Sequence, residues 1–204
     1  NISRLSESVF DYCSSLSSLS IPNTIKSIGK YAFDHCSGIK GTLNIPDSVI
    51  DFEVNAFSYC SGIDELNFGC GITRIPDYCF SNCDGLISLN IPDCITSIGS
   101  YAFSSCSGIL GNLEIPDSVT SIEPYAFSYC SGFQTLKISN NMTKISMNTF
   151  EFCFNLSYFE IPESVVCIES NAFDHCTGIC KTLVIPSTVK ILGSNSFSYC
   201  SGIT

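Results

Sequence analysis

The two histidines of the chain have the spacing that comes nearest to a metal site. Each stands in an Asp-His-Cys run, at Asp34-His35-Cys36 and at Asp174-His175-Cys176. All three residue types are common metal ligands in proteins. The two runs lie near opposite ends of the chain, and no Cys-x-x-Cys pair accompanies either of them. We therefore expect no metal site and no cofactor.

Catalytic patterns are missing as well. The sequence contains no Gly-x-Ser-x-Gly nucleophile elbow, no phosphate-binding glycine loop and no paired-carboxylate pocket. Its recurring acidic residues, Asp47, Asp93, Asp117 and Glu163, each follow a Pro, as turn chemistry favours, and we expect them to be solvated. The sequence predicts that the protein is not an enzyme.

The spacing of the fourteen cysteines indicates how the chain is organised, because nine of them belong to a strictly repeated Phe-x-x-Cys motif. Successive Phe residues of the motif are separated by about 23–24 residues, which predicts a solenoid of stacked coils. We name each coil, from one Phe to the next, by its first residue. The nine Phe residues are Phe10, Phe33, Phe57, Phe80, Phe103, Phe127, Phe150, Phe173 and Phe197.

Each coil carries an apolar-x-apolar triplet, such as Leu113 and Ile115, which is typical of a short strand with one face in the core. A Pro ends the predicted strand in six coils, at Pro22, Pro46, Pro92, Pro116, Pro162 and Pro186. Stacking the coils brings the triplets together as a parallel sheet. A single coil cannot close a core, so stability must come from its neighbours.

A larger repeat of three coils is visible in the same alignment. Every third coil, beginning at Phe33, Phe103 and Phe173, carries one additional residue before the triplet. The coils in which Gly69 and Ser139 replace the Pro are likewise separated by three steps of the repeat. We infer that a block of three coils was duplicated.

These motifs resemble a known family. Ile-Pro-Asp-Ser-Val-Thr-Ser-Ile at 115–122 and Tyr-Ala-Phe-x-x-Cys-Ser-Gly-Ile at 101–109 are similar to the BspA-like leucine-rich repeats, and the resemblance covers nearly the whole chain. It implies a right-handed leucine-rich-repeat solenoid with short parallel β-strands on the concave face, and turns, short extended segments and short helical turns on the other sides. It also implies a surface or secreted protein of a bacterium or parasitic protist, with a role in adhesion.

The periodic cysteines are expected to be buried free thiols, because stacked coils about 4.8 Å apart give them parallel Cβ directions whereas a disulfide needs converging ones. Cys79 replaces a core Ala, and Cys94 replaces a Ser or Thr of a turn. Any bridged or reactive thiol is expected among Cys70, Cys167 and Cys180. The two histidines occupy a column filled by many residue types, which indicates a surface position with no required chemistry.

Composition excludes several classes of function. The chain is 45% hydrophobic and 14% charged, so it should fold, and its net charge of −10 would repel nucleic acid and anionic membranes. No apolar run approaches the roughly 18 residues of a membrane-spanning helix. We expect no nucleic-acid partner and no direct membrane insertion.

The exposed face of the predicted sheet is the remaining candidate site. Residues between the two apolar positions of each triplet point away from the core. Together with Tyr158, which stands directly before the first apolar residue of its triplet, they change from amides to charged and aromatic residues along the chain. The ligand-contact candidates are Asn67, Asn90, Glu114, Lys137, Tyr158 and Glu160. The same residues could equally serve only to solubilise the strands. Tyr59, Tyr129 and Tyr199 could form a second contact patch, or they could serve only as hydrophobic cover over the loops.

We expect residues 1–204 to form a single leucine-rich-repeat domain of about eight coils. Neither end shows a polar capping coil, so we expect a segment of a longer protein or end-to-end self-association. The leading hypothesis is a non-catalytic surface module that binds a host or matrix protein or a glycan; the alternative is a structural spacer or intracellular protein-interaction scaffold. Three sequons, at Asn1, Asn141 and Asn155, permit glycosylation.

Overall fold

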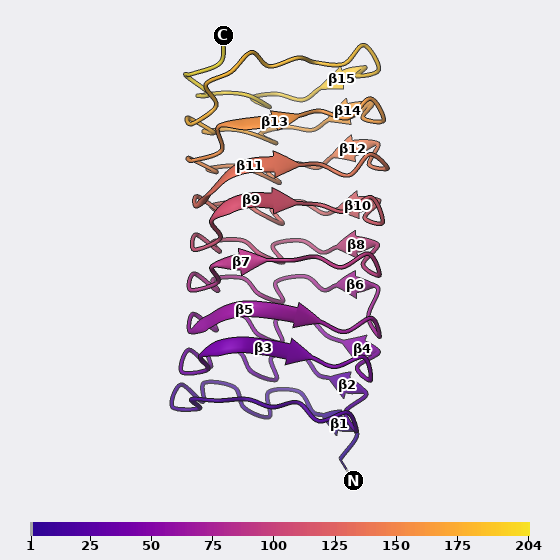
Figure 1. The fold of residues 1–204 in the computed structure, drawn as a ribbon, viewed down its shortest axis with the longest axis vertical. Helices are drawn as coiled ribbons and strands as arrows, with labels where there is room; N and C mark the ends of the chain where they lie inside the picture. Colours follow the sequence, from indigo (N-terminus) through magenta and orange to yellow (C-terminus); the bar gives the residue numbers. More distant parts are fainter. Residues whose placement is uncertain (1) are drawn as a thin grey trace.

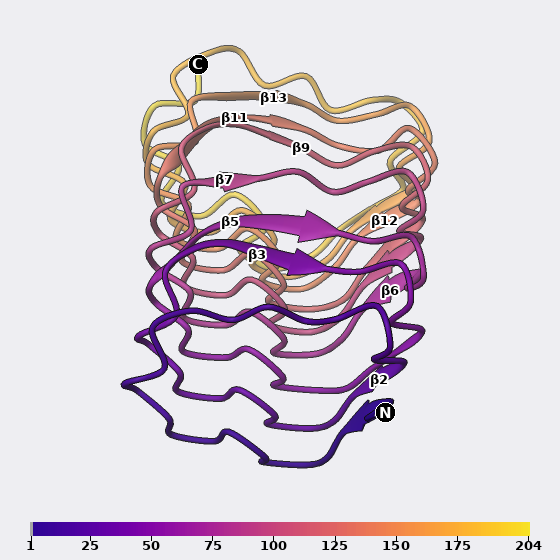
Figure 2. The same ribbon diagram turned by 60° about the horizontal axis from the view of Figure 1, so that its bottom comes forward.

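The computed structural model describes residues 2–204, which form a stack of similar coils, with the N-terminus at one end and the C-terminus at the other (Figure 1). The sequon at Asn1 begins outside the described residues. The tilted view in Figure 2 shows that the chain winds continuously, with each coil lying above the preceding one. The prediction of a leucine-rich-repeat solenoid with parallel strands is confirmed.

Two columns of strands run along the stack. One column forms the strand face and consists of β3 (Gly41–Ile45), β5 (Ile63–Phe68), β7 (Ser88–Leu89), β9 (Gly111–Glu114), β11 (Phe133–Lys137) and β13 (Tyr158–Glu160). Two-residue strands form the second column: β1 (Arg4–Leu5), β2 (Ser27–Ile28), β4 (Asp51–Phe52), β6 (Arg74–Ile75), β8 (Ser97–Ile98), β10 (Ser121–Ile122), β12 (Lys144–Ile145), β14 (Cys167–Ile168) and β15 (Ile191–Leu192).

The three-coil block appears in the sheets. The strand face consists of two parallel sheets, β3-β5-β7 and β9-β11-β13, and the break between them falls where the chain enters the Phe103 coil with its additional residue. Gly41 and Gly111 stand at this additional position with φ of 78° and 72°, a left-handed conformation that costs glycine little. The second column divides into three sheets, β1-β2-β4, β6-β8-β10 and β12-β14-β15. Its breaks precede β6 and β12, in the two coils that lack the Pro.

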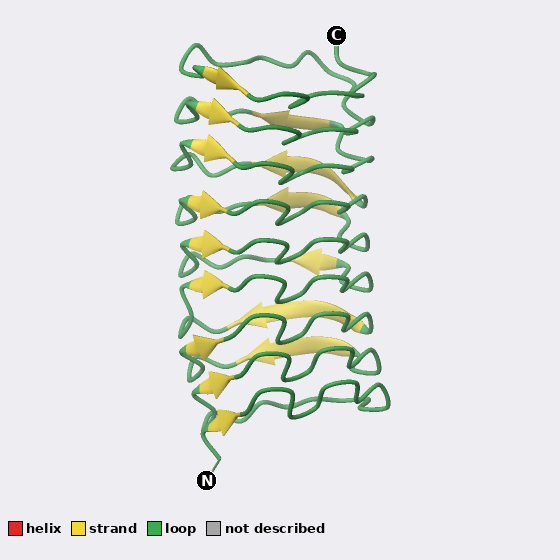
Figure 3. Ribbon diagram, turned by 180° about the vertical axis from the view of Figure 1, so that it is seen from behind, coloured by secondary structure: helices red, strands yellow, loops and turns green. Residues whose placement is uncertain are grey.

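The expectation of short helical turns is wrong, because residues 2–204 contain strands and turns but no helix (Figure 3). Two left-handed residues instead flank each motif Phe, as Tyr31 and His35 flank Phe33 with φ of 56° and 57°. These stop each turn before a helix can propagate. Backbone bonds then alternate: Cys36 N–H donates to the Phe33 carbonyl within the turn, at 3.2 Å, whereas Phe33 N–H donates to the carbonyl of Ala56, one turn of the solenoid later, at 2.8 Å.

The core is a continuous column of side chains supplied by every coil. The Phe rings are stacked throughout: Phe103 lies between Phe80 and Phe127, with ring centroids 5.6 and 5.4 Å away. Phe10 belongs to the first coil and is 36% exposed because only the Phe33 ring covers it, and at the other end Ile191 is 56% exposed. Interior coils are therefore covered on both sides, as the repeat predicts.

Candidate functional site

The charged part of the strand face is built by three adjacent strands in register. Lys137 on β11 lies opposite Glu114 on β9 and opposite Glu160 on β13. Their neighbours Leu113, Leu136 and Phe159 are buried in the core. Because side chains alternate along a strand, burial of these apolar residues directs Glu114, Lys137 and Glu160 outward.

Direct polar contacts join these exposed side chains. Lys137 forms an ion pair with Glu114, and the hydrogen bond to Glu114 raises the pKa of the Lys137 ammonium. The hydroxyl of Tyr158 donates to Glu160, which raises the pKa of Tyr158. The Lys181 ammonium lies 4.4 Å from the centroid of the Tyr158 ring. The sequence pattern does not identify Lys181 as a candidate, because this residue belongs to the turn before the triplet of the Phe173 coil.

A hollow of about 770 Å³ lies beside this group, bordered by Lys137, Asn140, Tyr158, Glu160 and Pro162 among others. Positive, acidic and aromatic groups therefore face one concave region across two coils. Such a surface suits a ligand that combines polar groups with a flat apolar part.

The other candidates lie elsewhere on the strand face. Asn90 and Glu114 border a separate hollow of about 340 Å³. Asn67 belongs to the first sheet, where its amide donates to Asn44 at 2.9 Å. The six candidates therefore share a face, but only Lys137, Tyr158 and Glu160 among them border the hollow of about 770 Å³.

The opposite patch of tyrosines is only partly assembled. Tyr59 and Tyr129 border a hollow of about 620 Å³ together with His35, whereas Tyr199 lies outside it. The histidine column, for which the sequence indicates a surface position with no required chemistry, shares one backbone conformation. All nine residues of this column have φ between 55° and 62°. Many stack on their neighbours, including His35 on Tyr12 and on Tyr59 with ring centroids 4.2 Å apart in each pair.

The prediction for the cysteine column is confirmed for its eight members from Cys36 to Cys200, which are buried and free. Each thiol donates to the backbone oxygen of the Phe one coil earlier, as Cys60 does to Phe33 at 3.1 Å. Cys13, in the first coil, is free and exposed. Burial raises the pKa of the Cys36 thiol to about 11, so the column is chemically inert at neutral pH.

One disulfide joins two successive coils, between Cys70 and Cys94, whose Cα atoms lie 5.5 Å apart. The sequence restricts any bridged thiol to Cys70, Cys167 and Cys180, and Cys70 is indeed bridged. Its partner Cys94 replaces a turn Ser or Thr as described, but it lies outside that set, so the restriction is wrong for Cys94. Both residues lie in turns outside the core, where two side chains can converge on each other. The cysteines of the core column cannot do so, because their Cβ directions are parallel. Cys167 is free and partly exposed, and Cys180 is free and exposed.

Two sequon asparagines, Asn141 and Asn155, are exposed. The Asn141 amide donates to the Asp117 backbone oxygen at 2.7 Å. Within residues 2–204, no helix is long and apolar enough to cross a membrane.

The model of the BspA type leucine rich repeat region matches residues 3–130 and 73–204, in six copies. The chain belongs to this family. BspA-type repeats form a scaffold that is generally non-catalytic and binds partners. Comparison with curated proteins gives no match.

Solved structures with the same fold include the T. pallidum leucine rich repeat protein, with a TM-score of 0.63 and 23% identity over 87% of this chain and 72% of that chain. The pneumococcal vaccine antigen PcpA has a TM-score of 0.50 and 20% identity over 87% of this chain and 58% of that chain. A leucine rich cell surface protein from Faecalibacterium prausnitzii has a TM-score of 0.46 and 22% identity, covering 100% and 82% of the two chains.

Proposed function

We propose that this BspA-type solenoid is a non-catalytic binding module at the cell surface or in secreted form, and that it recognises a host or matrix protein or a glycan through its strand face. The observation that carries the proposal is the group formed by Lys137, Tyr158 and Glu160 beside one hollow on adjacent strands. Family membership supports a binding role, and the name of the F. prausnitzii neighbour describes a surface protein.

The backbone beneath this group favours recognition. Lys137 and Glu160 belong to hydrogen-bonded strands, and Leu136 and Phe159 anchor those strands in the core. A contact surface fixed before binding loses little conformational entropy when a partner arrives. The Tyr158 ring supplies an apolar face of the kind on which sugar rings and aliphatic side chains pack, and the carboxylates and ammonium supply directional hydrogen bonds.

The test compares the unmodified chain with the variant K137A/Y158A/E160A in binding to immobilised matrix proteins, to host cells and to a glycan array. All three substitutions are at exposed or partly exposed positions, so the solenoid should fold normally. The matched control T42A/E65A removes a polar pair from the first sheet of the same face. We expect the triple variant to lose at least tenfold in affinity while the control retains binding.

Unchanged binding by the triple variant would refute this surface as the contact site. If the unmodified chain binds none of these ligands and is found in a reducing compartment, the adhesion proposal fails. The spacer or intracellular scaffold role then becomes the better account.

A further inference from the structure

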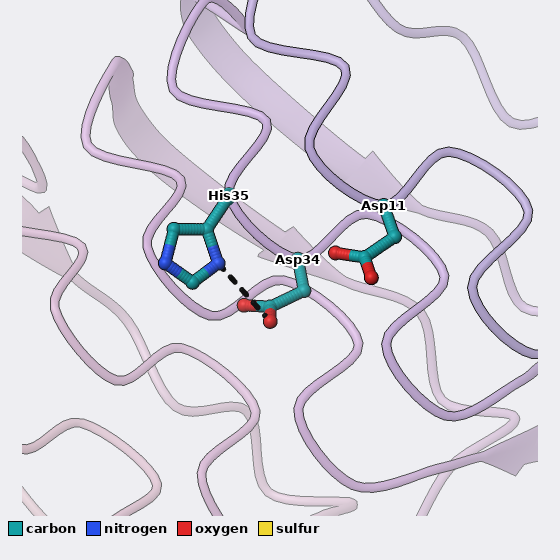
Figure 4. Close-up of side chains that lie close together, drawn as sticks. All are labelled: Asp11, Asp34 and His35. Atoms are coloured by element: carbon teal, nitrogen blue, oxygen red, sulfur yellow. Dashed lines mark ion pairs between the residues drawn. The ribbon is translucent and has the colours of Figure 1, made fainter.

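Asp11, Asp34 and His35 form a cluster in the turns that follow Phe10 and Phe33 (Figure 4). Asp11 belongs to the Phe10 coil, whereas Asp34 and His35 belong to the Phe33 coil. One ligand atom from each residue lies within 4.8 Å of the other two. In Figure 4 the imidazole and the Asp11 carboxylate approach the Asp34 carboxylate from opposite sides.

Three polar atoms of this cluster are buried and make no hydrogen bond, although Asp34 and His35 form an ion pair with each other. Asp34 is only 8% exposed. Oδ1 of Asp34, Oδ1 of Asp11 and Nδ1 of His35 are all buried and accept or donate no hydrogen bond within the described part of the chain. Buried polar atoms are normally satisfied in folded proteins, so three orphaned atoms at one place call for a ligand.

The geometry of the pair formed by Asp34 and His35 fits a shared cation better than a hydrogen bond. Nδ1 of His35 lies 3.1 Å from Oδ2 of Asp34, but the contact lacks hydrogen-bond geometry. A tetrahedral zinc ion binds nitrogen and oxygen ligands at about 2.0–2.2 Å, which places two of its ligand atoms roughly 3.3–3.5 Å apart. A small adjustment of the side chains would therefore admit the ion.

The surroundings hold the imidazole in place. The His35 ring is stacked between Tyr12 and Tyr59, which leaves Nδ1 directed at the carboxylates. Cys36 is not a ligand, because its thiol donates to the Phe10 backbone oxygen at 3.0 Å inside the coil. The cluster thus offers two carboxylates and one imidazole, a ligand set that zinc and similar divalent transition metals accept.

A second copy of the motif, six coils later, provides an internal comparison. Asp174 and His175 repeat the pair, with Nδ1 and Oδ1 3.0 Å apart, and Glu151 stands where Asp11 stands in the first copy. The Glu151 carboxylate accepts a hydrogen bond from the Asn148 amide at 2.7 Å, at a position occupied by Ser8 in the first copy. The third ligand is therefore engaged in the second copy.

The geometry points to a three-ligand site for a divalent transition metal, of the zinc type, formed by Asp11, Asp34 and His35. The ion joins the Phe10 coil to the Phe33 coil and keeps its remaining coordination position for water or for a ligand from a partner. Two carboxylates give the site a charge of −2, and neither forms an ion pair with Lys or Arg among residues 2–204.

The experiment measures zinc binding by calorimetry and cobalt binding by absorption spectroscopy. Exposed thiols also bind these metals, so every protein carries C13S, C167S and C180S. In this background the variant D11S/D34S/H35S is compared with the parent and with H175S. The natural chain has Ser81, Ser104 and Ser105 at the corresponding positions of its middle block, so the triple variant should fold.

We expect the parent and H175S to bind one equivalent of zinc, and zinc to raise the unfolding temperature of both. The triple variant should lose at least a hundredfold in affinity and should show no zinc-dependent temperature shift. The cobalt spectrum should lack a thiolate charge-transfer band. Equal affinity in the triple variant, no binding by the parent, or a thiolate band from bound cobalt would each overturn the assignment.

Discussion

The thiol of Cys106 donates its hydrogen to the backbone oxygen of Phe80, 3.1 Å away and one coil earlier. The same bond recurs in every coil from Cys36 to Cys200. At each step one Phe carbonyl accepts one thiol hydrogen. A small side chain with a weak donor is therefore used to satisfy a backbone group inside the core. The cysteine column stabilises the stack without disulfides.

This arrangement predicts which thiols react. Burial raises the pKa of the Cys130 thiol to about 12, so at pH 8 the thiolate that an alkylating reagent attacks is almost absent. Treatment of the native protein with iodoacetamide, followed by peptide mass spectrometry, should modify Cys13, Cys167 and Cys180. The column from Cys36 to Cys200 should react only after denaturation. Rapid modification of Cys106 in the native protein would contradict the buried ladder.

The disulfide between Cys70 and Cys94 should contribute measurably to stability. It closes a loop over a sequence separation of 24 residues, for which the chain-entropy model gives about 3 kcal/mol. The variant C94S places at this turn the Ser that the chain already has at Ser48 and Ser118. We expect urea denaturation to give a free energy of unfolding about 2–3 kcal/mol lower. C180S, which removes a free exposed thiol, serves as the control and should unfold like the parent.

The Phe stack should be most sensitive in its interior. Phe103 is completely buried, so F103A should destabilise the protein by about 3–5 kcal/mol, the usual cost of a large cavity. Phe10 is 36% exposed in the first coil, and F10A should cost clearly less. Chemical denaturation of both variants measures the difference. Equal losses would mean that the coils do not depend on their neighbours as the stacked core requires.

The hydrogen bonds of Asp117 predict that the protein loses stability at acid pH. The backbone N–H of Asn140 donates to its carboxylate at 2.8 Å and, with the Asn140 side chain, lowers the pKa of Asp117 below its ordinary value of 3.8. Folding therefore favours the charged form. The contribution of Asp117 to stability is present above pH 3.8 and is lost as the pH falls through the lower pKa of the folded state.

An NMR titration of the folded protein should locate the Asp117 midpoint below 3.8. N140A removes the side-chain donors but keeps the backbone N–H, so it should bring the midpoint only part of the way back. A midpoint at or above 3.8 in the parent would show that the two turns are not bonded in solution.

Much of the fold follows from the printed sequence, because every coil has apolar residues at the same positions and must bury them in the same way. Phe103, Cys106 and Leu113 each belong to columns that recur once in every coil, and only stacked coils bury all members of such columns. The insertion before Leu113 also predicts the three-coil block that the sheets display. The outward direction of Lys137 and Glu160 follows from strand alternation alone.

The tertiary structure decided what depends on turn geometry. Nothing in the residue pattern indicates that His35 has a φ of 57°, since L-residues seldom adopt this conformation, and without it the approach of His35 and Asp34 to Asp11 is invisible. Cys94 looks like any turn residue until its Cα is placed 5.5 Å from that of Cys70. The residue types of each coil are enough to show which positions are buried. The direction of a side chain in a turn depends instead on backbone angles and on the neighbouring coil.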